Sequence, residues 1–341
     1  MGSLNRKYIR KVVQWILPFA LTAALVWVMF RKVDLAEMAA ILRNGVDWWW
    51  ILAAMGLSVV SHMVRGARWR LQLDHLGIRA PFMALCCSVF GCYALNILFP
   101  RLGEVWRCSY ISRRGKAPFS TVFGSIVADR LSDSAAVLVL FLLTLCVAYS
   151  GIMSFLDRYP VGKDIVGLIS SPWIWLGLTG ALLICVLAWR KWRRSRLGEA
   201  LGRIARQLWH GFASVASMPG RNRFVFYTVL IWGCYFIQLY LAFFAFPFTR
   251  ALAAEPALGY GLIPCLVAFV LSSIGMGIPS NGGLGPWNLA VMFGLAIYGI
   301  PDAEGTTFSI VQWSGQAVML FILGLYTIGY ILLSRAKDPE E

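Results

Sequence analysis

Long apolar runs, separated by short loops, constrain this chain more than any other feature of its sequence. An α-helix needs about 17–25 predominantly apolar residues to cross a bilayer. Among the runs of at least this length, six are expected to cross completely, and they cover residues 12–30, 48–64, 119–149, 173–189, 224–246 and 308–333. Hydrophobic residues make up 59% of the chain and charged residues only 14%, against about 25% charged residues in soluble domains. We therefore expect residues 1–341 to form a single transmembrane domain of the all-α polytopic class.

The distribution of Lys and Arg predicts which loops face the cytoplasm. The formal net charge is +15, and cytoplasmic loops of membrane proteins are enriched in basic residues. The basic residues gather in residues 1–11, 65–80, 107–118, 190–223 and the C-terminal tail. These segments lie on one side only if the apolar run at 81–99 does not cross the membrane. We therefore expect residues 81–114 to form a re-entrant hairpin from the cytoplasmic side, broken at Asn96, Pro100 and Gly103, with both termini in the cytoplasm.

A second break lies at residues 275–288, GMGIPSNGGLGPWN, where five glycines and two prolines interrupt an apolar region. Such a sequence does not continue an ordinary helix. Residues 259–300 therefore form either a second re-entrant hairpin, which enters from the outside, or two complete spans. The prediction is about six full spans plus two re-entrant or broken-helix hairpins, eight or so helices in all. Two hairpins of opposite orientation are the geometry of an inverted repeat, whose broken elements form a midplane substrate site in many transporters.

Ionisable residues enter the apolar pattern in one stretch, residues 96–133. They fall in two groups: Arg101, Glu104 and Arg107, which are three residues apart and share one helix face, then Asp129, Arg130 and Asp133. In one interpretation the three arginines and three acids neutralise one another as a structural ion network. In the other, arginines remain free to hold a phosphate, which suits the forked guanidinium group. We expect Arg101, Arg107 and Arg130 to hold the phosphate. The acids, Glu104, Asp129 and Asp133, would orient them or take up a proton.

The glycine-rich break offers a second candidate site. Pro286 fits the first turn of a new helix, whose N-terminus would direct its positive dipole into the membrane centre and favour an anion. We therefore expect four residues of the break to line the substrate site, namely Ser280, Asn281, Gly282 and Gly283. The alternative is a plain tight turn between two spans.

The most basic segment covers residues 190–223, where nine Lys and Arg stand against one acid, Glu199. Apolar residues recur there at steps of three and four, which predicts an amphipathic helix on the cytoplasmic membrane surface. The segment either sets the topology alone or binds anionic lipid headgroups or a partner.

No motif for covalent or metal chemistry is present in the sequence. The eight cysteines show no metal-ligand spacing, and His62, His75 and His210 are far apart. A nucleotide-binding fingerprint and a Ser-His-Asp order are also absent. We therefore expect no metal, no cofactor and no enzymatic activity. We also expect no nucleic-acid partner, because the positive-inside distribution of the loops already explains the positive charge.

Three motifs, in order, resemble a known family. NILFPRLGEVWR at 96–107 resembles the N-x-L-x-P-x-R-x-G-E-x-x-R pattern of the lysylphosphatidylglycerol synthase transmembrane-domain family. DRLSD at 129–133 resembles its E-R-x-x-D element, and PSNGGLGPWN at 279–288 resembles its P-x-x-G-G-L-G-x-x-E element. Asp129 stands where the family usually has a glutamate. Asn288 stands where the family usually has an acidic residue. The resemblance implies a flippase-like protein of the bacterial inner membrane, without the aminoacyltransferase domain of the fused synthases.

The leading expectation is an inner-membrane translocase that moves an anionic phospholipid or a polyprenyl-phosphate-linked lipid between leaflets. Its headgroup would pass through the polar seam between the two hairpins while the tails stay in lipid. The alternative is a non-catalytic membrane subunit or scaffold of a lipid- or glycan-modifying enzyme, with residues 190–223 as the docking surface. An enzyme acting on a lipid-linked sugar is a third reading, and the absence of a catalytic motif disfavours it.

Overall fold

The computed structural model describes residues 20, 22–25, 27, 35–43, 45–149, 171–172, 175–177, 179–180, 183 and 218–337. Every regular element within these residues is a helix, so the predicted all-α polytopic class is confirmed. The predicted spans at 12–30 and 173–189 lie largely outside the described residues. The same holds for residues 190–217 of the predicted basic segment, whereas residues 221–223 open a long helix.

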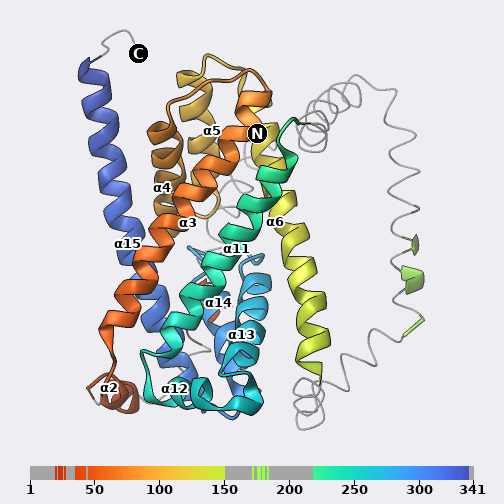
Figure 1. Ribbon diagram of the computed structural model, residues 1–341, viewed down its shortest axis with the longest axis vertical. Helices are drawn as coiled ribbons and strands as arrows, with labels where there is room; N and C mark the ends of the chain where they lie inside the picture. The colour runs from red at the N-terminus through yellow and green to blue at the C-terminus, as the bar shows by residue number, and fades with distance from the viewer. Residues whose placement is uncertain are drawn as a thin grey trace, which may run out of the picture.

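Four long helices run most of the height of the molecule in Figure 1. They are α3 (Trp48–His75), α6 (Phe119–Val147), α11 (Arg221–Phe243) and α15 (Asp302–Lys337). Each contains a stretch long and apolar enough to cross a membrane. Short helices, α2 (Leu35–Arg43) and α12 (Pro247–Ala254), lie at the lower end in the same view. Four of the six predicted spans therefore correspond to observed helices.

Two helical hairpins lie between the long helices. The first consists of α4 (Phe82–Leu98) and α5 (Leu102–Arg114), in the upper half of Figure 1. The second consists of α13 (Leu262–Gly275) and α14 (Pro286–Ala296), in the lower half. A short 3-10 turn, η1 (Pro256–Leu258), precedes α13, and together they are long enough to cross. With 11 residues, about 16 Å, α14 is too short for a hydrocarbon core of about 30 Å. The second arm is therefore not a complete span, and α13 and α14 form a broken-helix hairpin.

The two hairpins touch at their tips. The backbone N–H of Gly282 donates to the carbonyl oxygen of Asn96, with an N–O distance of 2.9 Å. The Asn281 side-chain Nδ2 donates to the carbonyl oxygen of Leu98 at 3.1 Å, and Trp313 Nε1 on α15 donates to the carbonyl oxygen of Gly282 at 2.9 Å. Gly282 has φ of +57°, and an added Cβ would stand 3.1 Å from Ile97, so this crossing needs a glycine.

The packing of the two halves corresponds helix by helix. Helices α3 and α11 pack against each other between the hairpins. The first arm of each hairpin packs against the last long helix of the other half, α4 on α15 and α13 on α6. The second arm packs against the long helix that follows it, α5 on α6 and α14 on α15. These pairs are the contacts expected of an inverted repeat, with the hairpins entering from opposite ends.

Each hairpin is closed by a glycine at which its two arms meet. A methyl group on Gly103 would stand 2.0 Å from the carbonyl oxygen of Cys92, and one on Gly294 would stand 2.6 Å from Cα of Ala268. One apolar core lies around the first hairpin and a second lies around the other, so each hairpin has its own packing environment. Only a residue without a side chain permits this close approach of the two arms.

The second predicted span is longer than the sequence pattern indicates. The prediction that it ends at Val64, with residues 65–80 forming a cytoplasmic loop, is wrong, because α3 continues through His75. The residues beyond Val64 that recur at steps of three and four are buried rather than solvated: Arg65, Arg68, Trp69 and Gln72. The helix therefore carries two arginines into the interior of the protein.

Candidate functional site

Two arginines of α3 and two aspartates of α6 form a buried ionic quartet, Arg65, Arg68, Asp129 and Asp133. Nη2 of Arg68 lies 2.6 Å from Oδ1 of Asp129 and 2.8 Å from Oδ1 of Asp133. Nη1 of Arg65 lies 2.7 Å from Oδ2 of Asp133 and 3.3 Å from Oδ2 of Asp129. Each carboxylate is thus bridged by both guanidinium groups, and the four charges cancel.

Helical spacing explains why the quartet closes. Arg65 and Arg68 are three residues apart and the two aspartates are four apart, so each pair lies on one helix face. Two further arginine donors reach α11: Nη1 of Arg68 donates to Oγ1 of Thr228 at 3.1 Å, and Nε of Arg65 donates to the hydroxyl of Tyr235 at 3.3 Å. Breaking a buried pair of this kind costs about 3–5 kcal/mol. The quartet therefore holds α3, α6 and α11 together.

A second ion pair joins the first hairpin to α6. Nη2 of Arg130 lies 2.9 Å from Oε1 of Glu104, and Nδ2 of Asn96 donates to Oε2 of Glu104 at 3.1 Å. The other amide atom of Asn96, Oδ1, accepts from the backbone N–H of Gly103 at 2.9 Å. The side chain of Arg130 is 36% exposed and that of Glu104 is 22% exposed, so this pair lies at an accessible edge of the site.

Arg107 is fully buried, and none of its three guanidinium nitrogens has a hydrogen-bond partner among the described residues. Its guanidinium carbon lies 3.8 Å from the centroid of the Trp69 ring, and Nε1 of Trp69 donates to Oγ of Ser125 at 3.0 Å. A cation–π contact of this kind is worth about 2 kcal/mol, whereas the effective penalty for burying an ion is several kcal/mol. The charge of Arg107 is therefore incompletely compensated.

The six predicted charges do not form one closed network among themselves, and Arg107 is left without a hydrogen-bond partner among the described residues. Arg65 and Arg68, which the sequence analysis placed in a loop, take up both aspartates, while Glu104 pairs with Arg130. Arg107 pairs with none of these acids, although it lies within electrostatic range of the quartet. Arg101 is exposed at the start of α5, with a left-handed φ of +62°, and takes part in neither ion-paired group.

The glycine-rich break forms a contact between the hairpins. Asn281 is 9% exposed, and its amide bonds the tip of the first hairpin, while Gly282 and Gly283 have φ of +57° and +84°. Ser280 is partly buried, and its hydroxyl donates to the carbonyl oxygen of Ile278 at 3.3 Å. A role of these four residues in substrate binding stays a prediction.

Asn288, where the family pattern has an acid, caps α14. Its Oδ1 accepts from the backbone N–H of Gly285 at 3.1 Å, and its Nδ2 donates to Oγ of Ser309 at 3.4 Å. The side chain is fully buried, so an amide meets both a donor and an acceptor without burying a charge.

Sequence reasoning missed Arg65, Arg68, His62 and Trp69 as parts of this interior. The string RGARWR reads as a basic loop at the end of a span, which is the usual meaning of such a pattern. The signal available was the spacing, because a pair of arginines three apart matches a pair of aspartates four apart on another helix. No group of three His, Cys, Asp or Glu residues with the geometry of a metal site occurs in the part of the chain that the structure describes.

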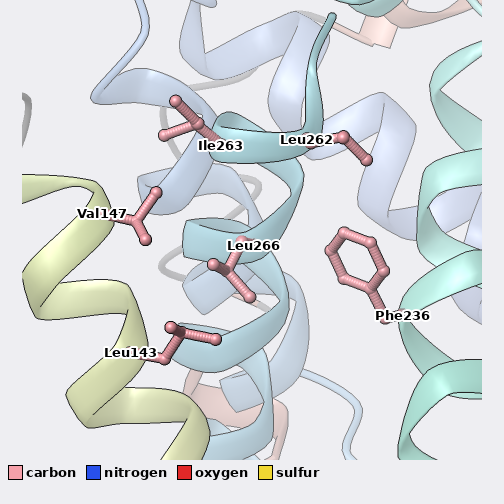
Figure 2. Close-up of a pocket in the computed structure, with 6 residues that line it drawn as sticks. All are labelled: Leu143, Val147, Phe236, Leu262, Ile263 and Leu266. Carbon is pink, nitrogen blue, oxygen red and sulfur yellow. The ribbon is translucent and has the colours of Figure 1, made fainter. Parts of the chain in front are cut away.

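An apolar cavity of about 320 Å³ lies between α6, α11 and α13, and Figure 2 shows its lining. All the residues that line it are hydrophobic: Leu143, Val147, Phe236, Leu262, Ile263 and Leu266. Its volume is at the small end of ligand pockets, about 300–1,000 Å³. The cavity carries no polar group that would hold a headgroup.

Residues 15–324 match the family described as the lysylphosphatidylglycerol synthase TM region. The chain belongs to this family. The matched residues include both hairpins, the ionic quartet and Arg107, and the resemblance seen in the sequence is confirmed. The protein is accordingly a multi-pass membrane protein of the lysylphosphatidylglycerol synthase TM family.

Two proteins of archaea share shorter stretches with this family member. The glycosyltransferase AglD of Haloferax volcanii is 30% identical over 114 residues, which cover 33% of this chain and 18% of that protein. The UPF0104 membrane protein MJ1595 of Methanocaldococcus jannaschii is 26% identical over 142 residues, which cover 41% of this chain and 39% of that protein. The chain thus matches less than half of the length of either relative.

Proposed function

We propose that this protein is a lipid translocase that moves an anionic lipid between the two leaflets of the membrane, without changing it chemically. The observation that carries the proposal is Arg107, a buried guanidinium with no hydrogen-bond partner among the described residues. A phosphate bound there would supply the missing opposite charge and accept hydrogen bonds from the guanidinium fork. Hydrogen bonds to charged groups are worth about 1.5–3 kcal/mol.

The route for the headgroup follows the polar edge of the first hairpin. Arg130 and Glu104 are partly exposed, and Arg107 lies on the same helix as Glu104 at one turn further along. We infer that a phosphate first exchanges for Glu104 at Arg130 and then reaches Arg107. The tips of the two hairpins close the route near the middle of the molecule (Figure 1). The apolar cavity beside α6 and α13 suits a lipid tail, because its lining is entirely hydrophobic.

Orientation follows from the charged residues at the two ends of the molecule. Arg113, Arg114 and Lys116 end the first hairpin, and Arg221 and Arg223 open α11 at the same upper end. Acids gather at the other end, at Glu37, Asp302 and Glu304. By the positive-inside rule we propose that the basic end faces the cytoplasm of a bacterial cell, with both termini on that side of the inner membrane.

The decisive experiment is a flipping assay in proteoliposomes. Fluorescent phosphatidylglycerol and a fluorescent short-chain polyprenyl phosphate serve as probes, and an external quencher reports transfer between leaflets. Arg107→Gln should slow transfer roughly 10- to 100-fold, the equivalent of one charge-assisted hydrogen-bond group. Arg130→Ala should also slow transfer, whereas Arg250→Gln is the matched control, because Arg250 is 52% exposed at the opposite end.

The proposal is refuted if wild-type protein, folded and reconstituted, transfers no probe faster than empty vesicles do. It is also refuted if Arg107→Gln transfers lipid at the wild-type rate. Substitutions that only unfold the protein are recognised by their elution in size-exclusion chromatography, so a slow variant counts only when it elutes as wild type does.

A second candidate function is a membrane subunit that positions a glycan-modifying enzyme. The observation that favours it is the partial match to a protein named as a glycosyltransferase. The match covers 18% of that protein's length. We propose residues 190–223, rich in arginine, as the docking surface for a partner or for anionic lipid headgroups. Charge reversal in this segment would then abolish complex formation. Neither the wild-type protein nor the variant would transfer lipid.

A further inference from the structure

His62 is a buried titratable residue that neither ionic group uses. It lies on α3, one turn before Arg65, and is 3% exposed. Both ring nitrogens lack a hydrogen-bond partner among the described residues. A neutral imidazole offers one donor and one acceptor, so leaving both unmade is costly in a buried position. The position therefore holds a base whose proton-binding nitrogen is unoccupied.

Aromatic rings connect this imidazole to both groups of charges. It stacks on Tyr93, with ring centroids 4.8 Å apart and planes inclined by 8°, and meets Tyr235 edge-on at 6.5 Å. The guanidinium of Arg130 lies 5.7 Å from the Tyr93 centroid, and that of Arg65 lies 5.9 Å from both tyrosine rings. One tyrosine thus separates His62 from Arg130, the arginine at the accessible edge of the site.

We propose that His62 takes up one proton when the anionic headgroup binds, so that lipid and proton move together. This inference rests on the proposed lipid translocase and names the residue through which its site responds to pH. The proton passes from water to a ring nitrogen and turns neutral imidazole into imidazolium, with no other bond made or broken. The class of ligand is a phosphodiester or phosphomonoester anion accompanied by H⁺.

Electrostatics explains why the two events are linked. Without lipid, burial and the neighbouring Arg65 both oppose a second positive charge at His62. A phosphate at Arg130 adds negative charge beside Tyr93, the ring on which His62 stacks, and this charge favours imidazolium. By thermodynamic reciprocity, a proton on His62 must then increase lipid affinity by the same factor. The groups around the imidazole are Arg65 on α3, Tyr93 on α4, Tyr235 on α11, and Asp129, Arg130 and Asp133 on α6, which reach it through Arg65 and the tyrosines.

The acids of the site are poorer proton acceptors than this histidine. Asp129 and Asp133 each contact two guanidinium groups, and Glu104 accepts from Arg130 and Asn96. Protonating any of them would break an ion pair that is already made. His62 is the titratable base in this interior whose protonation breaks no hydrogen bond, at least among the described residues.

The test measures proton uptake on binding in detergent, with short-chain phosphatidylglycerol as the probe. Its phosphodiester stays ionised near neutral pH, so any proton taken up is bound by the protein. Calorimetry in two buffers of different ionisation enthalpy should show proton uptake on binding by wild type that grows as the pH falls, and affinity should rise by at most about tenfold for each unit by which pH falls. His62→Gln and His62→Phe should both take up no proton, and the exposed His75→Gln should behave as wild type.

The outcomes separate this inference from the proposed function. Wild-type protein that binds and transfers phosphatidylglycerol without proton uptake overturns the role of His62 and leaves the translocase intact. Proton uptake that persists in both His62 variants overturns it as well. Wild-type protein that neither binds nor transfers any probe refutes the translocase, and the role of His62 falls with it. His62→Phe keeps an aromatic ring on Tyr93, so it preserves the stacking if His62→Gln fails to fold.

Discussion

Arg68 and Arg107 are both fully buried, yet replacing each with methionine should change stability in opposite directions. Methionine is unbranched and close to arginine in length, so both variants remove the charge and keep much of the packing. Arg68 bridges two carboxylates at 2.6 and 2.8 Å, whereas Arg107 has no hydrogen-bond partner among the described residues. The comparison isolates the effect of having a partner.

The magnitudes follow from these contacts. Arg68→Met leaves two aspartates with a single guanidinium and should lower the free energy of unfolding by about 3–5 kcal/mol. Arg107→Met removes a cation–π contact worth about 2 kcal/mol, but it also removes a buried ion whose effective desolvation penalty is several kcal/mol. The net result should be an increase in the free energy of unfolding of roughly 1–3 kcal/mol.

Equilibrium unfolding in mixed micelles of detergent and SDS, followed by tryptophan fluorescence, measures both free energies. Arg107→Met should be the more stable protein and at the same time the slower one in the flipping assay. If Arg107→Met loses as much stability as Arg68→Met, Arg107 is a structural residue. The inference that its charge is held for an anion would then be wrong.

Three further predictions concern the hairpins. Gly103→Ala should destabilise the protein by about 1–3 kcal/mol through overpacking, because the arms of the hairpin meet there. Gly233→Ala, in the middle of α11 with open space around it, should instead stabilise it by about 0.5–1 kcal/mol in the same unfolding assay. Trp313→Phe should lower the free energy of unfolding by about 1 kcal/mol, because the indole N–H of Trp313 donates a hydrogen bond to the tip of the second hairpin. Hydrogen exchange at that tip should also become faster. Single cysteines at Arg113 and Ala257, in a cysteine-free background, should react with impermeant maleimide from opposite faces of the membrane; labelling from the same face would contradict the two-hairpin topology.

The fold was largely predictable because apolar length and helix breakers act locally. Asn96, Pro100 and Gly103 interrupt one apolar run, and the glycines at 275–288 interrupt another, which places both hairpins. The charge count predicted that the first hairpin is re-entrant, but it could not decide between a hairpin and two spans for the second. The short α14, with 11 residues, shows that the second arm is not a complete span. The crossing of the tips depends on a long-range contact between Asn96 and Gly282, which the chain pattern alone does not specify.

The site was less predictable because charge pairing is a property of three helices at once. A basic string at the end of an apolar run usually marks a loop, and this expectation assigned Arg65 and Arg68 to the cytoplasm. Their burial reverses the balance of the site, because they neutralise the two aspartates and leave Arg107 in surplus. The amide of Asn288 was likewise read as a missing acid, whereas it caps α14.

The ionic quartet also constrains the order in which the protein is assembled. Its partners are 61 to 68 residues apart, so α3 enters the membrane with two arginines before α6 has been made. Each arginine opposes insertion by up to about 2.5–3.5 kcal/mol at the centre of a span. At about 5–20 residues per second, the aspartates emerge roughly 3–14 seconds later. During that interval the two arginines of α3 lack their carboxylate partners, so we expect α3 to stay near the translocon or the interface until α6 arrives.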